Sequence, residues 1–302
     1  MKRGVVILLV FSILLTACTG VQYGKSKEEA ATVQDAHIGV KGVTVNFIKN
    51  NPPDVAYEGS KLNLVVELKN EGAYTSSGTL YLTGHDPRLV RISPNTKTFS
   101  QLDGKTKFAF GGYEAVSFVS QDLVLPSGTD TYPVDFQASA CYNYKTEARI
   151  PVCIDPDPSS ILENEVCKTT SPTVSGGQGA PIAVTAVRED ARPGEVGFQI
   201  TFTNQGGGIV VDKYSLAKCP TPLTFDSIDA VYYDVSLGDV PASYVDCSPK
   251  NKVRMANGQG TMYCKFSLVD ATSPAYKSIL AINLDYGYLS QVTKRVNIKS
   301  MG

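Results

Sequence analysis

The stretch YPVDFQASACYNY (residues 132–144) alternates apolar with polar side chains and ends in two tyrosines separated by one residue. A second stretch, YKSILAINLDYGY (276–288), has the same pattern, and its tyrosines fall on those of the first at an offset of 144 residues without a gap. Side chains of one parity lie on one face of a β-strand, so each stretch predicts a strand with one face toward a core. The chain therefore contains an internal repeat.

A shorter match supports the repeat. LVVELKNEG (64–72) and FQITFTNQG (198–206) are both alternating segments that end in Asn-x-Gly. In each repeat we expect the tyrosine-rich strand to be followed by a short turn and a last strand. For the first repeat these are a turn at Thr146–Ala148 and a strand from Arg149 to Ile154, and for the second a last strand from Lys294 to Ile298.

The composition favours strands and turns over helices. The chain has 26 Gly, 17 Pro and 16 Tyr but no Trp. Short strands with turns about every 8 to 12 residues predict an all-β fold. We expect two tandem antiparallel β-sandwiches of immunoglobulin-like or fibronectin-like type after an N-terminal signal helix. Domain 1 is expected at 39–156, a linker rich in Pro, Ser, Thr and Gly at 157–178, and domain 2 at 179–302.

The strands that end in Asn-x-Gly resemble CARDB-type and related immunoglobulin-like modules of bacterial and archaeal surface proteins. The joining stretch SGGQGAPIAV (175–184) resembles segments of exported archaeal proteins. These resemblances imply two tandem modules on a prokaryotic, and more narrowly an archaeal, cell surface.

The head of the chain indicates export. Lys2 and Arg3 form a basic start, an apolar run follows, and small residues end the run. This is the three-part pattern of a secretory signal. A membrane-spanning helix needs about 20 apolar residues, and the run is shorter than that.

Residues 15–18, Leu-Thr-Ala-Cys, resemble the lipobox of prokaryotic lipoproteins. The resemblance implies that residues 1–17 are removed as a signal peptide and that Cys18 carries a diacylglycerol, with acyl chains such as palmitate. Residues 18–38 would then be the lipidated cysteine and a polar stalk. The alternatives are an ordinary cleaved signal and an uncleaved signal anchor.

Cysteines after position 18 form an even set, which in an exported chain predicts disulfides. The candidates are Cys141, Cys153, Cys167, Cys219, Cys247 and Cys264. A turn at 146–148 would place Cys141 opposite Cys153, and the rival pairing is Cys153 with Cys167. The second domain holds three cysteines, so either one thiol is free or one bridge leaves the domain. In the latter case, if Cys141 pairs with Cys153, Cys167 is the natural partner for one of the three.

Acidic residues in the linker are candidate calcium ligands, namely Asp155, Asp157 and Glu163. An EF-hand reading of this segment fails, because Ser160 stands at the glycine position and Val166 at the position of the bidentate glutamate. We expect no metal and no cofactor.

Catalytic motifs are scarce. The two histidines, His37 and His85, lie in the expected stalk and near an expected turn. Ser215 and Lys218 match Ser-x-x-Lys, but the companion motifs of that hydrolase class do not occur. The sequence predicts a protein that is not an enzyme. A net charge of −1 without a basic run makes nucleic acid an unexpected partner.

The sequence thus predicts a lipoprotein on the extracytoplasmic face of the cell membrane, attached through its N-terminal lipid. We expect its two domains to mediate protein or surface-ligand interaction, with an envelope or surface protein as partner. The alternatives are a structural spacer of the envelope and an accessory subunit of a surface enzyme complex. The many tyrosines could form an adhesive surface or pack at the sandwich corners.

Overall fold

The computed structural model describes residues 36–158, 166–169, 171–172, 174–238, 240–268 and 274–301. Residues Gln34–Gly302 form one compact unit, and the remainder, Met1–Val33, is a separate unit. The predicted lipid site Cys18 and the calcium candidate Glu163 lie outside the described residues. The described residues are all-β, as the sequence predicts, and their strands pair antiparallel except for the short β2, which pairs parallel to β15.

The elements of the first repeat are β1 (Val43–Phe47), β2 (Val55–Tyr57), β3 (Lys61–Asn70), β4 (Ser76–Thr83), β5 (Thr96–Leu102), β6 (Tyr113–Asp122) and β7 (Thr131–Ile154). The strands of the second are β8 (Ile182–Arg192), β9 (Glu195–Asn204), β10 (Ile209–Val211), β11 (Ala230–Leu237), β12 (Val245–Ser248), β13 (Lys252–Arg254), β14 (Gln259–Ser267) and β15 (Tyr276–Lys299). Its 3-10 helices are η1 (Lys213–Lys218), η2 (Phe225–Ser227) and η3 (Ala242–Tyr244).

Strand order assigns these strands to one large sheet and two smaller ones within the described residues. The large sheet has the order β13-β11-β15-β7-β4-β5, with β10 and β2 also paired to β15. The smaller sheets are β1-β3-β6 from the first repeat and β12-β14-β9-β8 from the second. Buried side chains of all three sheets form one hydrophobic cluster. The core-facing residues of β7 and β15 are even-numbered, and buried residues of β4, β5, β11 and β13 join them from the same sheet.

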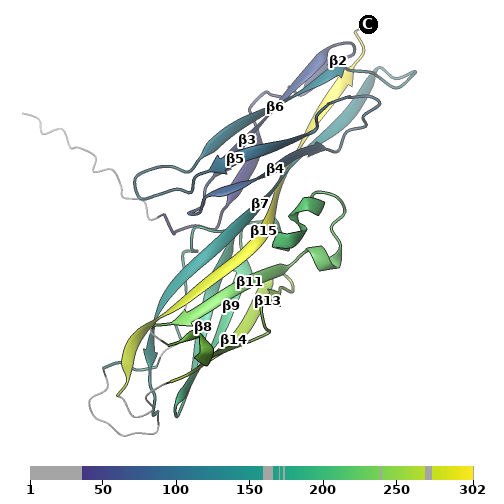
Figure 1. Cartoon of the computed structure of the whole chain (residues 1–302). Coiled ribbons are helices and arrows are strands. Elements are labelled where there is room, and N and C mark those ends of the chain that lie inside the picture. Colours follow the sequence, from purple (N-terminus) through teal and green to yellow (C-terminus); the bar gives the residue numbers. More distant parts are fainter. Residues whose placement is uncertain are drawn as a thin grey trace, which may run out of the picture. The chain divides into compact units, whose positions relative to one another are not determined.

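The two longest strands, β7 and β15, run through both repeats (Figure 1). Each has 24 residues, and they pair antiparallel from Thr131 opposite Lys299 to Ile154 opposite Tyr276. The turn expected at Thr146–Ala148 is therefore wrong, and the expected last strands are the second halves of β7 and β15. Even-numbered residues of β7 stay buried from Val134 through Thr146 to Ile154, so the alternation of core-facing side chains continues through the segment where a turn was expected.

The contacts place the two predicted domain ranges, 39–156 and 179–302, in one compact unit. The second half of β7 pairs with the first half of β15, so the first repeat contributes a strand to the sheet of the second. The side chain of Thr146 also links the two repeats, because its hydroxyl donates a hydrogen bond to Ile182 O at 2.6 Å. The division into two domains and a linker stays a prediction.

The repeated sequence motifs bond to each other within this unit. Tyr144 Oη donates to Asn70 Oδ1 at 3.0 Å, and Tyr288 Oη donates to Asn204 Oδ1 at 2.8 Å. The asparagine of each Asn-x-Gly is thus the hydrogen-bond partner of the second tyrosine of its own repeat. Its amide nitrogen donates to a backbone carbonyl four residues further on, which closes the following loop.

The first tyrosine of each Tyr-x-Tyr pair, Tyr142 or Tyr286, forms a hydrogen bond to the other repeat. Tyr142 Oη lies 3.0 Å from Ser290 Oγ, and Tyr286 Oη lies 2.9 Å from Thr146 Oγ1. Ser290 and Thr146 are 144 residues apart, as are Tyr286 and Tyr142, so the two hydroxyl pairs occupy equivalent positions of the two repeats. Burial raises the pKa of Tyr142 and of Tyr286 well above the usual value, which keeps both hydroxyls protonated.

The glycine of Asn-x-Gly is required by the same tyrosine. A Cβ on Gly206 would lie 2.5 Å from Tyr288 Oη and would also meet Pro181. A Cβ on Gly72 would meet Tyr144 Oη in the same way. The motif therefore provides an amide partner and the space in which the tyrosine hydroxyl sits.

All six described cysteines form disulfides: Cys141–Cys219, Cys153–Cys167 and Cys247–Cys264. The pairing of Cys141 with Cys153 is wrong, because both lie on β7. The rival pairing of Cys153 with Cys167 is found. As one of the two alternatives predicted, a cysteine of the second repeat, Cys219, bonds to a cysteine outside that repeat. Its partner is Cys141 and not Cys167.

We predict that Gly206→Ala and Tyr288→Phe are coupled. Gly206→Ala should lower the free energy of unfolding by about 1–3 kcal/mol through overpacking, and Tyr288→Phe by about 1 kcal/mol through a lost hydrogen bond. The double variant should lose less than the sum, because the added methyl no longer meets a hydroxyl. Urea denaturation measures all three, with the half-exposed Tyr244→Phe as control. Strict additivity would contradict the contact.

Candidate functional site

The outer face of β7 and β15, opposite the core, carries a segment that the first repeat lacks. In the first repeat, the strand beside β7 is the unbroken β4, whereas in the second repeat the strand beside β15 is divided into β10 and β11. In the second repeat, residues 212–228 lie between β10 and β11 and contain η1 and η2, seen as the green helical turns in Figure 1. We call residues 212–228 the inserted segment.

A disulfide and a small apolar cluster hold the inserted segment on the outer face. Cys219 of the segment bonds to Cys141 of β7. Val211 and Leu289 are buried with this bridge, and Leu216 packs against them. A Cβ on Gly287 would lie 2.9 Å from Leu216 Cδ2. This contact explains why the second repeat reads Tyr-Gly-Tyr where the first reads Tyr-Asn-Tyr.

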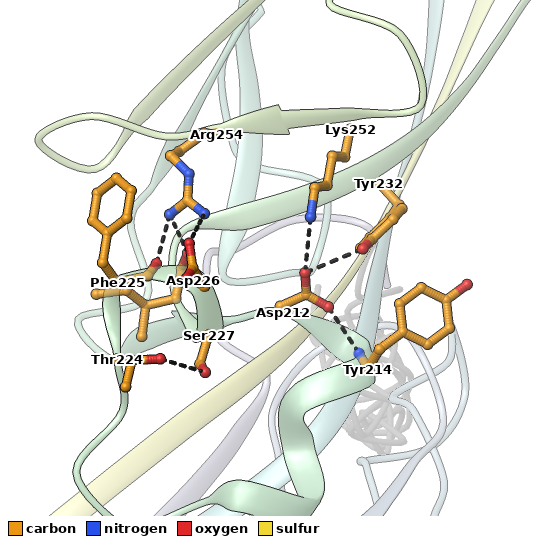
Figure 2. A network of polar contacts seen from close by, with 10 residues as sticks. Asp212, Tyr214, Thr224, Phe225, Asp226, Ser227, Tyr232, Lys252 and Arg254 are labelled. Atoms are coloured by element: carbon orange, nitrogen blue, oxygen red, sulfur yellow. Dashed lines mark hydrogen bonds and ion pairs between the residues drawn. The ribbon is translucent and has the colours of Figure 1, made fainter.

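The inserted segment begins at Asp212, which is buried and which Figure 2 shows at the centre of several polar contacts. The carboxylate accepts hydrogen bonds from Tyr214 N at 2.9 Å, from Tyr232 Oη at 3.1 Å and from Lys252 Nζ at 3.3 Å. Burial acts to raise the pKa of Asp212, but these hydrogen bonds outweigh it and hold the pKa below its usual value. Asp212 therefore stays ionised and fixes the start of η1.

The end of the inserted segment is fixed by Arg254 of β13 (Figure 2). The guanidinium donates to Phe225 O at 2.7 Å and to Ile228 O at 3.0 Å. It also lies 4.1 Å from the centroid of the Phe225 ring, within the range of a cation–π contact. Asp226 is 3.9 Å from the same guanidinium. Arg254 thus holds η2 in place.

The cations around Asp212 are already partnered. Lys213 bonds to Asp285 and lies 4.8 Å from the centroid of the Tyr232 ring. Lys252 bonds to Asp212 and lies 5.5 Å from the same ring. The contacts of Lys213 and Lys252 hold the inserted segment, with its exposed Tyr214, in position, which is a structural role.

A hollow of 740 Å³ lies beside the inserted segment, on the outer face of the sheet. None of its lining residues carries a charged side chain. One side is polar and consists of Thr83, Asn95, Gln137, Ser139 and Gln291. The other side is mostly apolar and includes Ile209, Pro220, Pro222, Leu223 and Ile228. Such a lining suits an uncharged ligand that offers hydrogen-bonding groups on one side and apolar groups on the other.

A second hollow, of 400 Å³, lies along the other side of the inserted segment. Ala217 and Tyr81 line both hollows. Gln137 Nε2 donates to Gln291 Oε1 at 3.0 Å, which joins β7 to β15 within the lining of the larger hollow. The inserted segment therefore forms a ridge between two uncharged depressions.

Two of the three predicted calcium ligands, Asp155 and Asp157, lie in the described part of the chain. Asp155 Oδ1 accepts a hydrogen bond from Asp157 N at 3.1 Å, as in an Asx turn. Among the described residues, no group of three or more His, Cys, Asp or Glu could hold a metal ion.

Both histidines contact aromatic rings. The His85 ring lies 5.5 Å from that of Phe136, and burial lowers the pKa of His85. The His37 ring lies 5.9 Å from that of Tyr74. Ser215 and Lys218 lie on η1, where the Ser-x-x-Lys spacing belongs to the inserted segment.

Sequence reasoning missed Asp212 and the role of Cys219 as an anchor of the inserted segment. The available signal was the long stretch after Asn204 compared with the short one after Asn70, together with the odd cysteine count of the second repeat.

No protein-family model matches the chain, and no curated protein matches it either. In the part of the chain that the structure describes, no helix combines the length and the apolar character needed to cross a membrane.

Glu189 on β8 is a carboxyl group whose surroundings shift its pKa strongly. Neither carboxylate oxygen has a hydrogen-bond partner among the described residues, although both are buried. Burial, and after it the negative charge of Asp155, raises the pKa of Glu189 to about 7. The folded protein therefore keeps a proton that the unfolded chain releases near pH 4.5.

We predict that the contribution of Glu189 to stability falls as the pH rises from about 4.5 to 7 and is lowest above that window. Glu189→Gln should raise the free energy of unfolding at pH 8 by roughly 1 kcal/mol, discounted because the group is only half buried. At pH 4 it should change little. Denaturation at both pH values measures this, with Glu67→Gln as a control. An equal change at both pH values would contradict the assignment.

Proposed function

We propose that the protein is a non-catalytic, membrane-anchored lipoprotein of the extracytoplasmic surface that binds a protein partner through the larger hollow beside the inserted segment. The observation that carries this proposal is the inserted segment itself. Only the second repeat has it, a disulfide fixes it to β7, and it shapes an uncharged depression of 740 Å³. A feature without which the first repeat forms the same strand arrangement is the best candidate for a function.

The location rests on the sequence. The lipobox-like residues 15–18 support lipidation of Cys18 after removal of residues 1–17. Three disulfides support an oxidising compartment outside the cytoplasm. Acyl chains on Cys18 would hold the mature chain at the membrane for long times.

We further assign the two halves as tandem immunoglobulin-like sandwiches that share β7 and β15. This assignment is supported by two small antiparallel sheets whose buried faces belong to the same core as the large sheet. The buried tyrosine hydroxyls that bond near the strand ends resemble the tyrosine corner of such folds.

The chemistry of the larger hollow favours an uncharged, extended segment of a partner protein. Amide side chains such as Gln137 and Gln291 can pair with backbone groups of such a segment. Pro220, Pro222 and Ile209 offer apolar contact on the other side. Because the Cys141–Cys219 bridge fixes the ridge in advance, less conformational entropy is lost on binding.

A structural spacer is the second candidate. The continuous pairing of β7 with β15 over 24 residues favours it, because a shared pair of strands makes the junction of the two repeats stiff. A spacer needs no particular side chains in the larger hollow, which separates the two proposals experimentally.

We predict that a photo-crosslinking amino acid at Thr221, exposed on the rim of the larger hollow, forms one discrete adduct with an envelope protein in intact cells. Thr221→Arg should reduce binding of the purified partner at least tenfold, because it places a charge in an uncharged site. Thr261→Arg, on the exposed face of β14, is the matched control and should bind normally.

Unchanged binding by Thr221→Arg would refute the larger hollow as the binding site. The absence of any adduct from Thr221, with the protein present at the membrane, would favour the spacer.

A further inference from the structure

The connection between β5 and β6, residues 103–112, exposes two phenylalanines almost completely. The exposed fractions of Phe108 and Phe110 are 87% and 83%. The counterpart in the second repeat, between β13 and β14, has only residues 255–258 and turns at Asn257-Gly258. The fold therefore does not require this longer loop, and two large apolar side chains in water need another explanation.

The loop is internally bonded, so the exposure of the rings is a property of an ordered turn. Thr106 N donates to Ala109 O at 2.9 Å, and Thr106 Oγ1 accepts from Phe108 N and Ala109 N at 3.3 and 3.0 Å. At the base, Gly112 N donates to Asp103 O at 2.7 Å. A Cβ on Gly111 would meet the backbone of Asn70. The base of the loop is thus closed against the sheet, and its tip projects.

Two lysines, Lys105 and Lys107, precede the phenylalanines in the loop. Lys107 Nζ lies 5.7 Å from the centroid of the Phe108 ring. Lys105 Nζ donates a hydrogen bond to Ile38 O, and Lys105 N donates to Gly72 O. Apolar rings beside cationic side chains are the composition of segments that dock on anionic membrane surfaces.

The contact with Ile38 places the loop beside the point where the chain enters the compact unit. Seventeen residues (19–35) separate Cys18 from Ala36, the first described residue. If Cys18 carries lipid, the unit is tethered by this short length on the side where the loop lies.

We propose that the loop 103–112 is a second membrane contact, in which Phe108 and Phe110 insert at the headgroup boundary while the exposed Lys107 faces anionic headgroups. This inference rests on the proposed anchoring of Cys18. The lipid attaches the chain, and the loop fixes how the unit is oriented on the bilayer.

The absence of tryptophan from the chain permits a direct test. The Phe110→Trp variant of the full lipidated protein contains one tryptophan, and Phe225→Trp, at a site 71% exposed, is the matched control. Both are reconstituted into vesicles of phosphatidylcholine with phosphatidylglycerol, with and without brominated acyl chains. We expect blue-shifted emission and at least threefold stronger quenching for Phe110→Trp than for Phe225→Trp. Adding Lys107→Glu should reduce that quenching.

Solvent-like emission from Phe110→Trp in protein that floats with the vesicles would overturn the loop contact and leave the anchor intact. Mass spectrometry of the N-terminal peptide reports the acyl group independently. Protein without that group whose Phe110→Trp emission is still quenched on added vesicles would refute the anchor and support the loop.

Discussion

The unbroken pairing of β7 with β15 is the constraint on which the rest of the structure depends. Because the two strands pass from one repeat into the other, neither repeat completes its sheet without a strand of its neighbour. The hydroxyl pairs Tyr142–Ser290 and Tyr286–Thr146 likewise connect the two repeats through side-chain hydrogen bonds. Buried hydroxyls must be hydrogen-bonded, so these pairs also fix the register in which the strands meet.

The internal repeat separates features that build the fold from features that have another purpose. The Asn-x-Gly and Tyr-x-Tyr motifs occur twice and bond to each other, so the abundance of tyrosine at these positions is structural. The inserted segment and the loop 103–112 occur once each. Asp212 and Arg254 hold the first in place, and Thr106 orders the second, which shows that the chain maintains both as defined surfaces.

Much of this fold follows from the spacing of apolar residues, and the errors have physical reasons. Parity and the 144-residue offset predict the core-facing strands, the repeat and the all-β class. The segment Lys145–Arg149 reads as a polar turn because its odd-numbered residues are charged, but these face solvent while Thr146 and Ala148 stay in the core. The partner of Cys141 could not be predicted, because it depends on how the inserted segment folds back. The role of Asp212 could not be predicted either, because it is a single acidic residue outside any motif and its partners Tyr232 and Lys252 are distant in the sequence.

Native-state hydrogen exchange tests the central claim, that the two repeats form one cooperative unit through β7 and β15. Phe198→Ala opens a cavity in the core of the second repeat, where this side chain is fully buried. We expect the amides of Leu80 on β4 and Ile200 on β9 to exchange faster by the same factor, because both need the whole unit to unfold. Faster exchange at Ile200 with no change at Leu80 would show that the repeats unfold separately and would contradict the account.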